Sequence, residues 1–333
     1  CKSKKSSQKD VPFIKIKGQP VLTDYFIYNS HLIGDNLLTN KINKNDYAFS
    51  VFTYHNDKFD YKMDLIRIGQ GPDEFEDQVY YTNQWYLNSN GELIFYVYEM
   101  NRIKLSKINL TQSLSENKTI IQDQIKVRPG TSFQDVYQFN DTILISNADN
   151  LSLDMQLINF YSINNNNFFK QIPFPNKIKN PMPNDIAYTQ QTFNSLYINT
   201  LRYSEEKEML VSAMTAQDII RIYDLNGNLL SEKKIGNAEV SNIKNFSENE
   251  RSYNVDLELT NDYIYTLYSG ERNTTYYEET PPTKIRQFDW NLNLIKTYIL
   301  DNSMNFFTIN DSGLVVGVSI TEEVIKIYNL NEK

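Results

Sequence analysis

Short apolar runs alternate with clusters of Asn, Asp and Gly along the chain, and one strand–turn pattern recurs. Its clearest copy is residues 222–228 (IYDLNGN), in which Ile and Tyr, both favoured in strands, precede a turn. The pair Asn226-Gly227 is typical of a two-residue hairpin. Further copies of varying similarity occur at 327–331, 287–291, 107–110, 160–164 and 52–56. This recurrence predicts an all-β protein built from structural repeats.

Each copy has similar surroundings. An apolar strand precedes it, as in 92–98, 142–145, 209–211, 263–267 and 314–316, and the copy itself contains a second strand. A more polar outer strand follows the turn, as in 229–235 and 294–299. The positions equivalent to Tyr223 are then 52, 108, 161, 223, 288 and 328, about 40 to 65 residues apart. This spacing suits four-stranded blades and predicts a six-bladed β-propeller.

The two ends of the chain are expected to close the ring. After Asn331 only two residues follow, so the sixth unit lacks an outer strand, while residues 12–17 (PFIKIK) form a strand without a partner. We expect this N-terminal strand to complete the last blade beside residues 323–330. An open solenoid would need polar capping repeats, and an irregular β-sandwich or two β-domains is the other alternative. The predicted organisation is a flexible tether at 1–10 and a single propeller domain at 11–333.

Composition narrows the classes of function. The net charge of −8 argues against binding to a nucleic-acid backbone, which requires a concentrated basic surface. A single cysteine allows no internal disulfide, and no run of about 18 apolar residues could span a bilayer. Stability must therefore come from the core and from backbone pairing. The aromatic content of 13% fits the half-buried surfaces of strands.

That single cysteine is residue 1, and its position resembles the start of a mature bacterial lipoprotein, where acyl chains are attached to an N-terminal cysteine. The resemblance implies a lipid-anchored protein of the cell envelope, because several acyl chains give stable anchoring. An unmodified thiol at Cys1 is the alternative. Residues 2–9 (KSKKSSQK) are polar and basic, which predicts a flexible tether. Surface export in such lipoproteins is associated with acidic residues after the cysteine, so these lysines favour the periplasmic side.

A second resemblance rests on residues 69–75 (GQGPDEF) and 96–103 (YVYEMNRI). Together these segments resemble the six-bladed, TolB-like propeller lipoproteins of the Bacteroidetes, in which a G-x-G-P-x-E-F segment follows the first blade. Asp73 stands where that family usually has Gly, and Glu99 where it usually has Asp. The resemblance implies the fold and an envelope location, and it implies little about activity.

The glycines and proline of 69–75 predict a sharp, preset crossing between two blades. Glu74 could accept hydrogen bonds from amides that such a bend leaves unpaired. A structural role is thus one interpretation of this segment, and a ligand-binding role for Asp73 or Glu74 is the other.

No catalytic signature is present: the sequence lacks H-E-x-x-H, a Cys/His ligand cluster, a G-x-S-x-G elbow and a phosphate loop. The two histidines, His31 and His55, are expected at the surface or rim. Residues 224–228 (DLNGN) resemble half of a calcium loop but lack its spacing and closing Glu, so a hairpin turn is expected. No catalytic residue, metal ligand or cofactor is predicted. A calcium ion in the channel remains an alternative, because some six-bladed propellers use one to hydrolyse lactones.

Candidate binding segments are expected to be loops between strands or blades, and they are long or rich in aromatic residues. They are 76–88, with Tyr80, Tyr81, Trp85 and Tyr86, the Pro-rich segment 172–200, and segment 270–283. Exposed aromatic rings suit stacking on sugars or anchoring of a peptide, although such rings could also pack between blades. The nominated ligand-binding residues are Asp73, Glu74, Trp85, Tyr276, Tyr277, Glu278 and Glu279.

The function expected from the sequence is a lipid-anchored binding or scaffold module that presents a propeller face to a protein or glycan. It would be monomeric, would not bind nucleic acid, and would touch the membrane only through its N-terminus. A metal-dependent hydrolase or lyase acting in the channel is the alternative, and a purely structural role in the envelope is a third.

Overall fold

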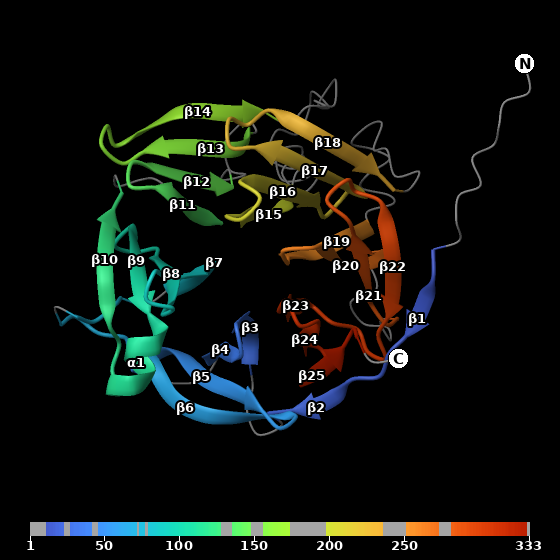
Figure 1. The fold of residues 1–333 in the computed structure, drawn as a ribbon, viewed down its shortest axis with the longest axis horizontal. Helices are drawn as coiled ribbons and strands as arrows, with labels where there is room; N and C mark the ends of the chain where they lie inside the picture. The colour runs from blue at the N-terminus through green and yellow to red at the C-terminus, as the bar shows by residue number, and fades with distance from the viewer. Residues whose placement is uncertain are drawn as a thin grey trace, which may run out of the picture.

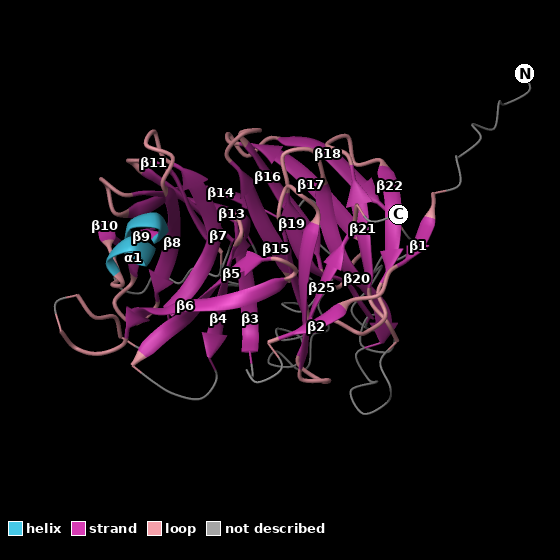
Figure 2. Cartoon of the chain, turned by 60° about the horizontal axis from the view of Figure 1, so that its bottom comes forward, coloured by secondary structure: helices cyan, strands magenta, loops and turns pink. Residues whose placement is uncertain are grey.

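The computed structural model describes residues 11–22, 27–41, 46–71, 73–76, 79–127, 135–147, 156–173, 198–235, 251–272 and 281–331. Their strands form six sheets around a central axis (Figure 1). One helix, α1 (Leu110–Glu116), lies at the edge of the ring (Figure 2). It begins where the Asn109 side chain accepts a hydrogen bond from Gln112 N, and ends at the left-handed residue Asn117. Among these residues, no helix has the length and apolarity needed to cross a membrane.

The sheets are antiparallel meanders. Blade 1 contains β3 (Ile27–Ile33), β4 (Asn36–Lys41), β5 (Tyr47–His55) and β6 (Lys58–Arg67). Blade 2 contains β7 (Val79–Leu87), β8 (Leu93–Glu99), β9 (Lys104–Asn109) and β10 (Ile121–Lys126). Blade 3 contains β11 (Val136–Asn140), β12 (Ile143–Asn147), β13 (Gln156–Ser162) and β14 (Asn167–Pro173). Blade 4 contains β15 (Asn199–Ser204), β16 (Met209–Met214), β17 (Ile219–Asp224) and β18 (Leu229–Lys234). Blade 5 contains β19 (Arg251–Leu259), β20 (Ile264–Arg272), β21 (Lys284–Phe288), β22 (Leu294–Ile299) and β1 (Phe13–Lys15). Blade 6 contains β23 (Phe306–Ile309), β24 (Leu314–Ser319), β25 (Val324–Asn329) and β2 (Gln19–Val21).

The recurring sequence position lies on the third strand of every blade, which confirms the predicted repeat. The six residues at this position are all buried: Phe52, Ile108, Tyr161, Tyr223, Phe288 and Tyr328. Each pairs with an apolar residue of the second strand, as Tyr223 does with Leu210. In blades 1, 3, 4 and 5 the pairing with the outer strand shifts register at this residue. Such bulges increase the local twist of the outer strands in these four blades.

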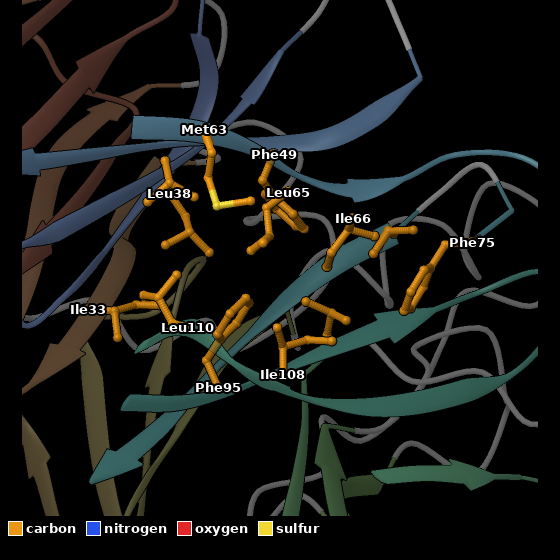
Figure 3. Close-up of a cluster of buried hydrophobic side chains, with 13 residues drawn as sticks. Ile33, Leu38, Phe49, Met63, Leu65, Ile66, Phe75, Phe95, Ile108 and Leu110 are labelled. Atoms are coloured by element: carbon orange, nitrogen blue, oxygen red, sulfur yellow. The ribbon is translucent and has the colours of Figure 1, made fainter. Parts of the chain in front are cut away.

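The apolar core is divided between the blades. Six buried clusters lie at the six junctions between neighbouring blades. At the junction of blades 1 and 2, Phe49 and Leu65 pack with Phe95 and Ile108 (Figure 3). Fully burying one such side chain stabilises the fold by about 1.5–3 kcal/mol. Each blade is therefore held by both of its neighbours, and the ring must close for all six junctions to form.

The N-terminal segment closes the ring, as predicted, but with a different strand. Residues 19–21, not 12–17, complete the last blade: β2 pairs antiparallel with β25, and Gln19 lies opposite Ile327. The apolar run that was predicted to do this forms β1, which pairs parallel with β22 of blade 5, and Phe13 lies opposite Thr297. The start of the chain thus covers the outer edges of two blades (Figure 1).

The polar residues between strands make turns, as the sequence predicted. Asp224 accepts hydrogen bonds from the backbone and side-chain amides of Asn228, and Gly227 has a φ of +70°. Asp289 and Asn293 repeat this arrangement in blade 5. Residues 224–228 therefore form a hairpin turn that is held by its own side chains.

Candidate functional site

The innermost strands surround the ring axis and are joined to one another by polar side chains. Five of the six junctions have such a bond. Leu32 N donates to Thr308 Oγ1 between blades 1 and 6, Gln84 and Gln138 bond reciprocally between blades 2 and 3, and Tyr137 Oη donates to Leu201 O between blades 3 and 4. Asp256 accepts from Arg202 Nη2 between blades 4 and 5 and from Phe307 N between blades 5 and 6. Their lengths lie between 2.6 and 3.1 Å. The sixth junction, between blades 1 and 2, is made by His31 and Asn83. Because buried polar groups need partners, these bonds fix the inner strands relative to one another.

Arg202, on β15, is the centre of this arrangement, and its side chain is 8% exposed. Its guanidinium lies 3.1 Å from Asp256, 3.5 Å from Asp135 and 3.7 Å from Glu258. Three carboxylates, from the blades on either side of Arg202, thus share one cation. Breaking such a buried ionic group by removing one partner is strongly destabilising.

Asn83 links Arg202 to His31. The pairing of β7 with β8 skips three residues between Tyr81 and Trp85, and Asn83 lies in this bulge with a φ of +59°. With its amide oriented to suit its neighbours, Asn83 donates to His31 Nδ1 (2.8 Å) and accepts from both Nη atoms of Arg202 (2.9 and 3.1 Å). The His31 ring also packs on Tyr81, with centroids 4.1 Å apart. Burial, and then the charge of Arg202, lower the pKa of His31 to about 3, so the ring is neutral.

Burial also changes the protonation of the carboxyls. It raises the pKa of Glu258 to about 8, with Asp256 and Asp135 as like charges nearby, although Arg202 acts in the opposite direction. The pKa of Asp256 is raised to about 6, again chiefly by burial, while Arg202 and the amides of Phe307 and Leu257 favour its ionised form. Burial raises the pKa of Asp135 as well. Glu258 is therefore largely protonated at neutral pH.

A cavity of about 480 Å³ opens beside this cluster. Its buried lining residues are Leu32, Gln84, Arg202, Thr308 and Ile309. Half-buried aromatic residues, including Tyr81, Trp85, Tyr86 and Tyr203, form much of its wall. Its exposed rim includes Glu205, Glu206, Asn261 and Asp311. The rim residues come just after the ends of innermost strands, so the cavity is the mouth of the channel on the side where these strands end, here called the cavity face.

The N-terminal segment enters the fold from the cavity face. β19 ends there, so β22, three antiparallel pairings away, begins there and runs to the opposite face. β1 runs parallel to β22, and Pro12 O accepts a hydrogen bond from Thr297 N. Residues 11 and 12, which precede β1, therefore lie on the side of the cavity.

The structure separates the nominated binding residues. Trp85 lines the cavity, whereas Asp73 and Glu74 follow β6 at the opposite face. Tyr276, Tyr277, Glu278 and Glu279 lie outside the described residues, as do Cys1 and most of segments 172–200 and 270–283. Segment 76–88 was expected to be a loop, but residues 79–87 form the inner strand β7. That strand brings three of its four nominated rings, all except Tyr80, to the cavity.

Glu74 has structural contacts of the kind that the sequence predicted. Its carboxylate accepts a hydrogen bond from Gly71 N (2.8 Å) and lies 3.3 Å from Arg67 Nε. A Cβ atom at Gly69 would lie 2.0 Å from this carboxylate, so a side chain there would displace the carboxylate from its present position. The crossing from blade 1 to blade 2 is thus built around the Glu74 side chain.

The second part of the motif meets this crossing at Glu99, which is fully buried. Glu99 accepts a hydrogen bond from Glu76 N (2.6 Å) and pairs with Lys104 (2.9 Å). Arg102 donates to Glu74 O and to Glu76. The two motif segments therefore form one polar network that fastens the blade 1–2 crossing to the β8–β9 hairpin.

Sequence reasoning missed the channel cluster. His31 was expected at the surface or rim, but it is buried in β3 by the neighbouring inner strands, whereas His55 is exposed in its hairpin as expected. Arg202, Asp135, Asp256 and Glu258 were not nominated. A signal was present: each inner strand carries a polar residue among apolar ones, at roughly one blade's length from the next. Within the described ranges, no group of three His, Cys, Asp or Glu residues is placed to hold a metal ion.

Comparisons with known proteins agree with this architecture. Two solved structures are similar over most of their length: a member of the DUF4221 family from Bacteroides vulgatus ATCC 8482 (TM-score 0.56, 13% identity, 93% of this chain and 95% of that one), and a protein of Bacteroides fragilis NCTC 9343 described provisionally as exported (TM-score 0.50, 11% identity, 95% and 98%). At these identities the likeness is one of fold. Comparison with curated proteins gave no match. The family model for TolB-like 6-blade propeller-like proteins matches residues 26–312. The chain therefore belongs to the TolB-like six-bladed propeller family.

Proposed function

We propose that this protein is a lipid-anchored binding module of the cell envelope, which presents its cavity face to a protein or glycan partner. The observation that carries the proposal is the cavity of about 480 Å³ at the channel mouth. Its volume is in the range of sites that bind small groups, and it combines aromatic walls with a few polar side chains. Tyr and Trp are suited to anchoring a partner because they give large contact area with few rotatable bonds.

Rigidity supports a recognition role. The lining residues Leu32, Gln84, Arg202 and Thr308 belong to the bonds that join neighbouring inner strands. A site held in this way loses little conformational entropy when a ligand binds, which favours affinity. Recognition by a preformed surface needs no movement of the blades.

The position of Pro12 supports an anchored module. It lies on the cavity face, and ten fully extended residues reach at most about 35 Å. Acylation of Cys1 would hold the cavity face within this distance of the membrane, in reach of partners attached to the same leaflet. The lysines that follow Cys1 favour the periplasmic side, where the protein would act as a monomer.

Capture from native envelopes tests the proposal. Acylated full-length protein, a Trp85→Ala variant and a Tyr80→Ala control would be compared by crosslinking and mass spectrometry. Tyr80 lies on the same strand but is exposed outside the cavity. We expect a partner that wild type and Tyr80→Ala retain and Trp85→Ala loses. Equal capture by all three proteins would contradict a role for the cavity. An unmodified thiol at the native Cys1 would contradict the anchor, and a stoichiometric divalent ion removed by chelators would favour a hydrolase instead.

A further inference from the structure

The charges around Arg202 do not balance when all its carboxylate partners are ionised. One guanidinium lies within 3.1 to 3.7 Å of three carboxylates. One of the two nearer ones, Asp256 or Asp135, is already enough to neutralise it. Glu258 is then an excess negative charge in a largely buried position, where charge is poorly solvated. Such a position gains from taking up one positive charge.

Glu258 is also the carboxyl of the three that faces the cavity. Asp256 accepts hydrogen bonds from the backbone amides of Leu257 and Phe307, and Asp135 accepts one from Leu201. Neither is among the lining residues, whereas Glu258 is, with a side chain that is 14% exposed. A ligand in the cavity can therefore reach Glu258 without displacing the interblade bonds of Asp256 and Asp135.

The rest of the described lining favours a cation over an anion. Arg202 is the one basic side chain in it, against the four acids Glu205, Glu206, Glu258 and Asp311. The aromatic wall adds ring faces that attract cations. One ring already has such a contact, since Lys107 Nζ lies 5.9 Å from the centre of Tyr86. Aromatic rings beside a carboxylate suit an ammonium or guanidinium group better than a phosphate or carboxylate.

We propose that the cavity binds a protonated amine or guanidinium group, the Lys or Arg side chain of a protein partner, with Glu258 as its carboxylate partner. This inference rests on the proposed function and narrows it to a protein partner that inserts a basic side chain. The Glu258 carboxylate pairs with the cation, and the aromatic wall encloses the aliphatic stem. Binding of a neutral glycan would contradict this narrower inference, so the test includes a neutral saccharide.

Binding of the cation should be coupled to release of a proton. Burial raises the pKa of Glu258 to about 8, so the empty site holds a proton that the ligand's charge replaces. The charged and titratable groups that face Glu258 or its partner Arg202 are Asp256 on β19, Asp135 before β11, Tyr137 on β11, Tyr81 on β7 and neutral His31 on β3. Below pH 8 the affinity should rise by up to about tenfold per pH unit.

The test uses full-length protein labelled with 5-fluorotryptophan. The chain has two tryptophans, Trp85 and Trp290, and a Trp290→Phe variant assigns their fluorine resonances. The probes are acetyl-Gly-Lys-Gly-amide, its norleucine counterpart, which lacks the charge, and chitobiose as a neutral saccharide. We expect the lysine peptide alone to shift the Trp85 resonance in a saturable manner. Glu258→Gln should weaken this binding about tenfold and remove its pH dependence.

The matched control is Glu323→Gln, which removes the same charge from an exposed residue of the β24–β25 hairpin on the opposite face. This variant should bind the lysine peptide like wild type. Any of three results would overturn the inference. The lysine and norleucine peptides could give equal shifts, the lysine peptide could give no saturable shift, or chitobiose could give a shift that Glu258→Gln leaves unchanged. The binding module would survive each of these results, since its own test is whether Trp85→Ala loses a partner that wild type captures from envelopes.

Discussion

Lys104 Nζ lies 2.9 Å from Glu99 Oε2 in an ion pair whose side chains are both buried. Lys104 also lies over the ring of Phe75, 4.6 Å from its centre, so one cation joins both halves of the family's motif. Replacing Lys104 by Met would leave Glu99 with only Arg102, at 3.5 Å, as a cationic partner. We expect Lys104→Met to lower the free energy of unfolding by about 3 kcal/mol, because an uncompensated buried carboxylate is costly. Urea denaturation would measure this loss.

The matched control for that experiment is Lys118→Met, since Lys118 pairs with Glu116 at the surface. Surface pairs contribute about 0–1 kcal/mol, so the control should be close to wild type. Equal effects of the two substitutions would show that the Glu99 network does not stabilise the crossing.

The channel carboxyls should make stability depend on pH. The pKa of Glu258 is raised from its ordinary 4.5 to about 8, so the folded protein binds more protons than the unfolded chain between these values. The contribution of Glu258 is therefore fully present below pH 4.5 and is lost as pH rises through 8, by at most about 1.4 kcal/mol per pH unit. Glu258→Gln cannot ionise, so its stability relative to that of wild type should increase from pH 5 to pH 8. Parallel profiles for the two proteins would contradict the burial of this carboxyl.

His31 should titrate in the opposite sense. Its pKa is lowered from 6.5 to about 3, so between these pH values the unfolded chain binds a proton at His31 that the folded protein does not bind. This contribution to stability is present above pH 6.5 and is lost as pH falls toward 3. Ring-nitrogen NMR should show one neutral form between pH 7.5 and 4.5, with the proton on Nε2 because Nδ1 accepts from Asn83. A midpoint above pH 5 would refute the arrangement, and Asn83→Ala should release the fixed tautomer.

Closure of the ring depends on a close approach at Gly18. A Cβ atom there would lie 2.6 Å from the ring of Tyr328 and 2.9 Å from Cβ of Lys326, so a side chain would push β2 away from β25. We expect Gly18→Ala to reduce stability by about 1–3 kcal/mol, which is typical of overpacking. Thermal unfolding and limited proteolysis would detect the loss. Gln19→Ala, which trims an exposed neighbour, should leave both unchanged; if Gly18→Ala did too, β2 would not be the closing strand.

The parts of the fold that could be predicted are those with a repeated local pattern. The third strand of each blade combines an apolar residue at one fixed position with Asn- or Asp-rich turns, and all six copies were located. The innermost strands escaped notice because they face a channel and carry polar residues such as Asn83 and Arg202 among apolar ones. Strands of this kind lack the clear alternation that marks a half-buried surface.

The closing strand was misplaced for a physical reason. Residues 12–17 have the stronger apolar alternation, and Ile14 and Ile16 do pack against the core between blades 5 and 6. The closing strand instead contains Pro20, which has no N–H to donate and so argues against a strand. At the outermost position of a blade that donor is not needed, and proline is tolerated. The channel cluster could not be assembled from sequence because its members come from five blades.

The junction of the two ends has a consequence for how the molecule is made. Gly18 and its hydrogen-bond partner Asp301 are 283 residues apart, and Gln19 pairs with Ile327, near the other end of the chain. Contacts between such distant segments form late, because the whole intervening loop must first be ordered. During synthesis or export, the earliest residues therefore stay unpaired until the final blade emerges. The edges of blades 5 and 6 are bare strands in that interval, so this step is where a chaperone would matter most and where misassembly between two copies would begin.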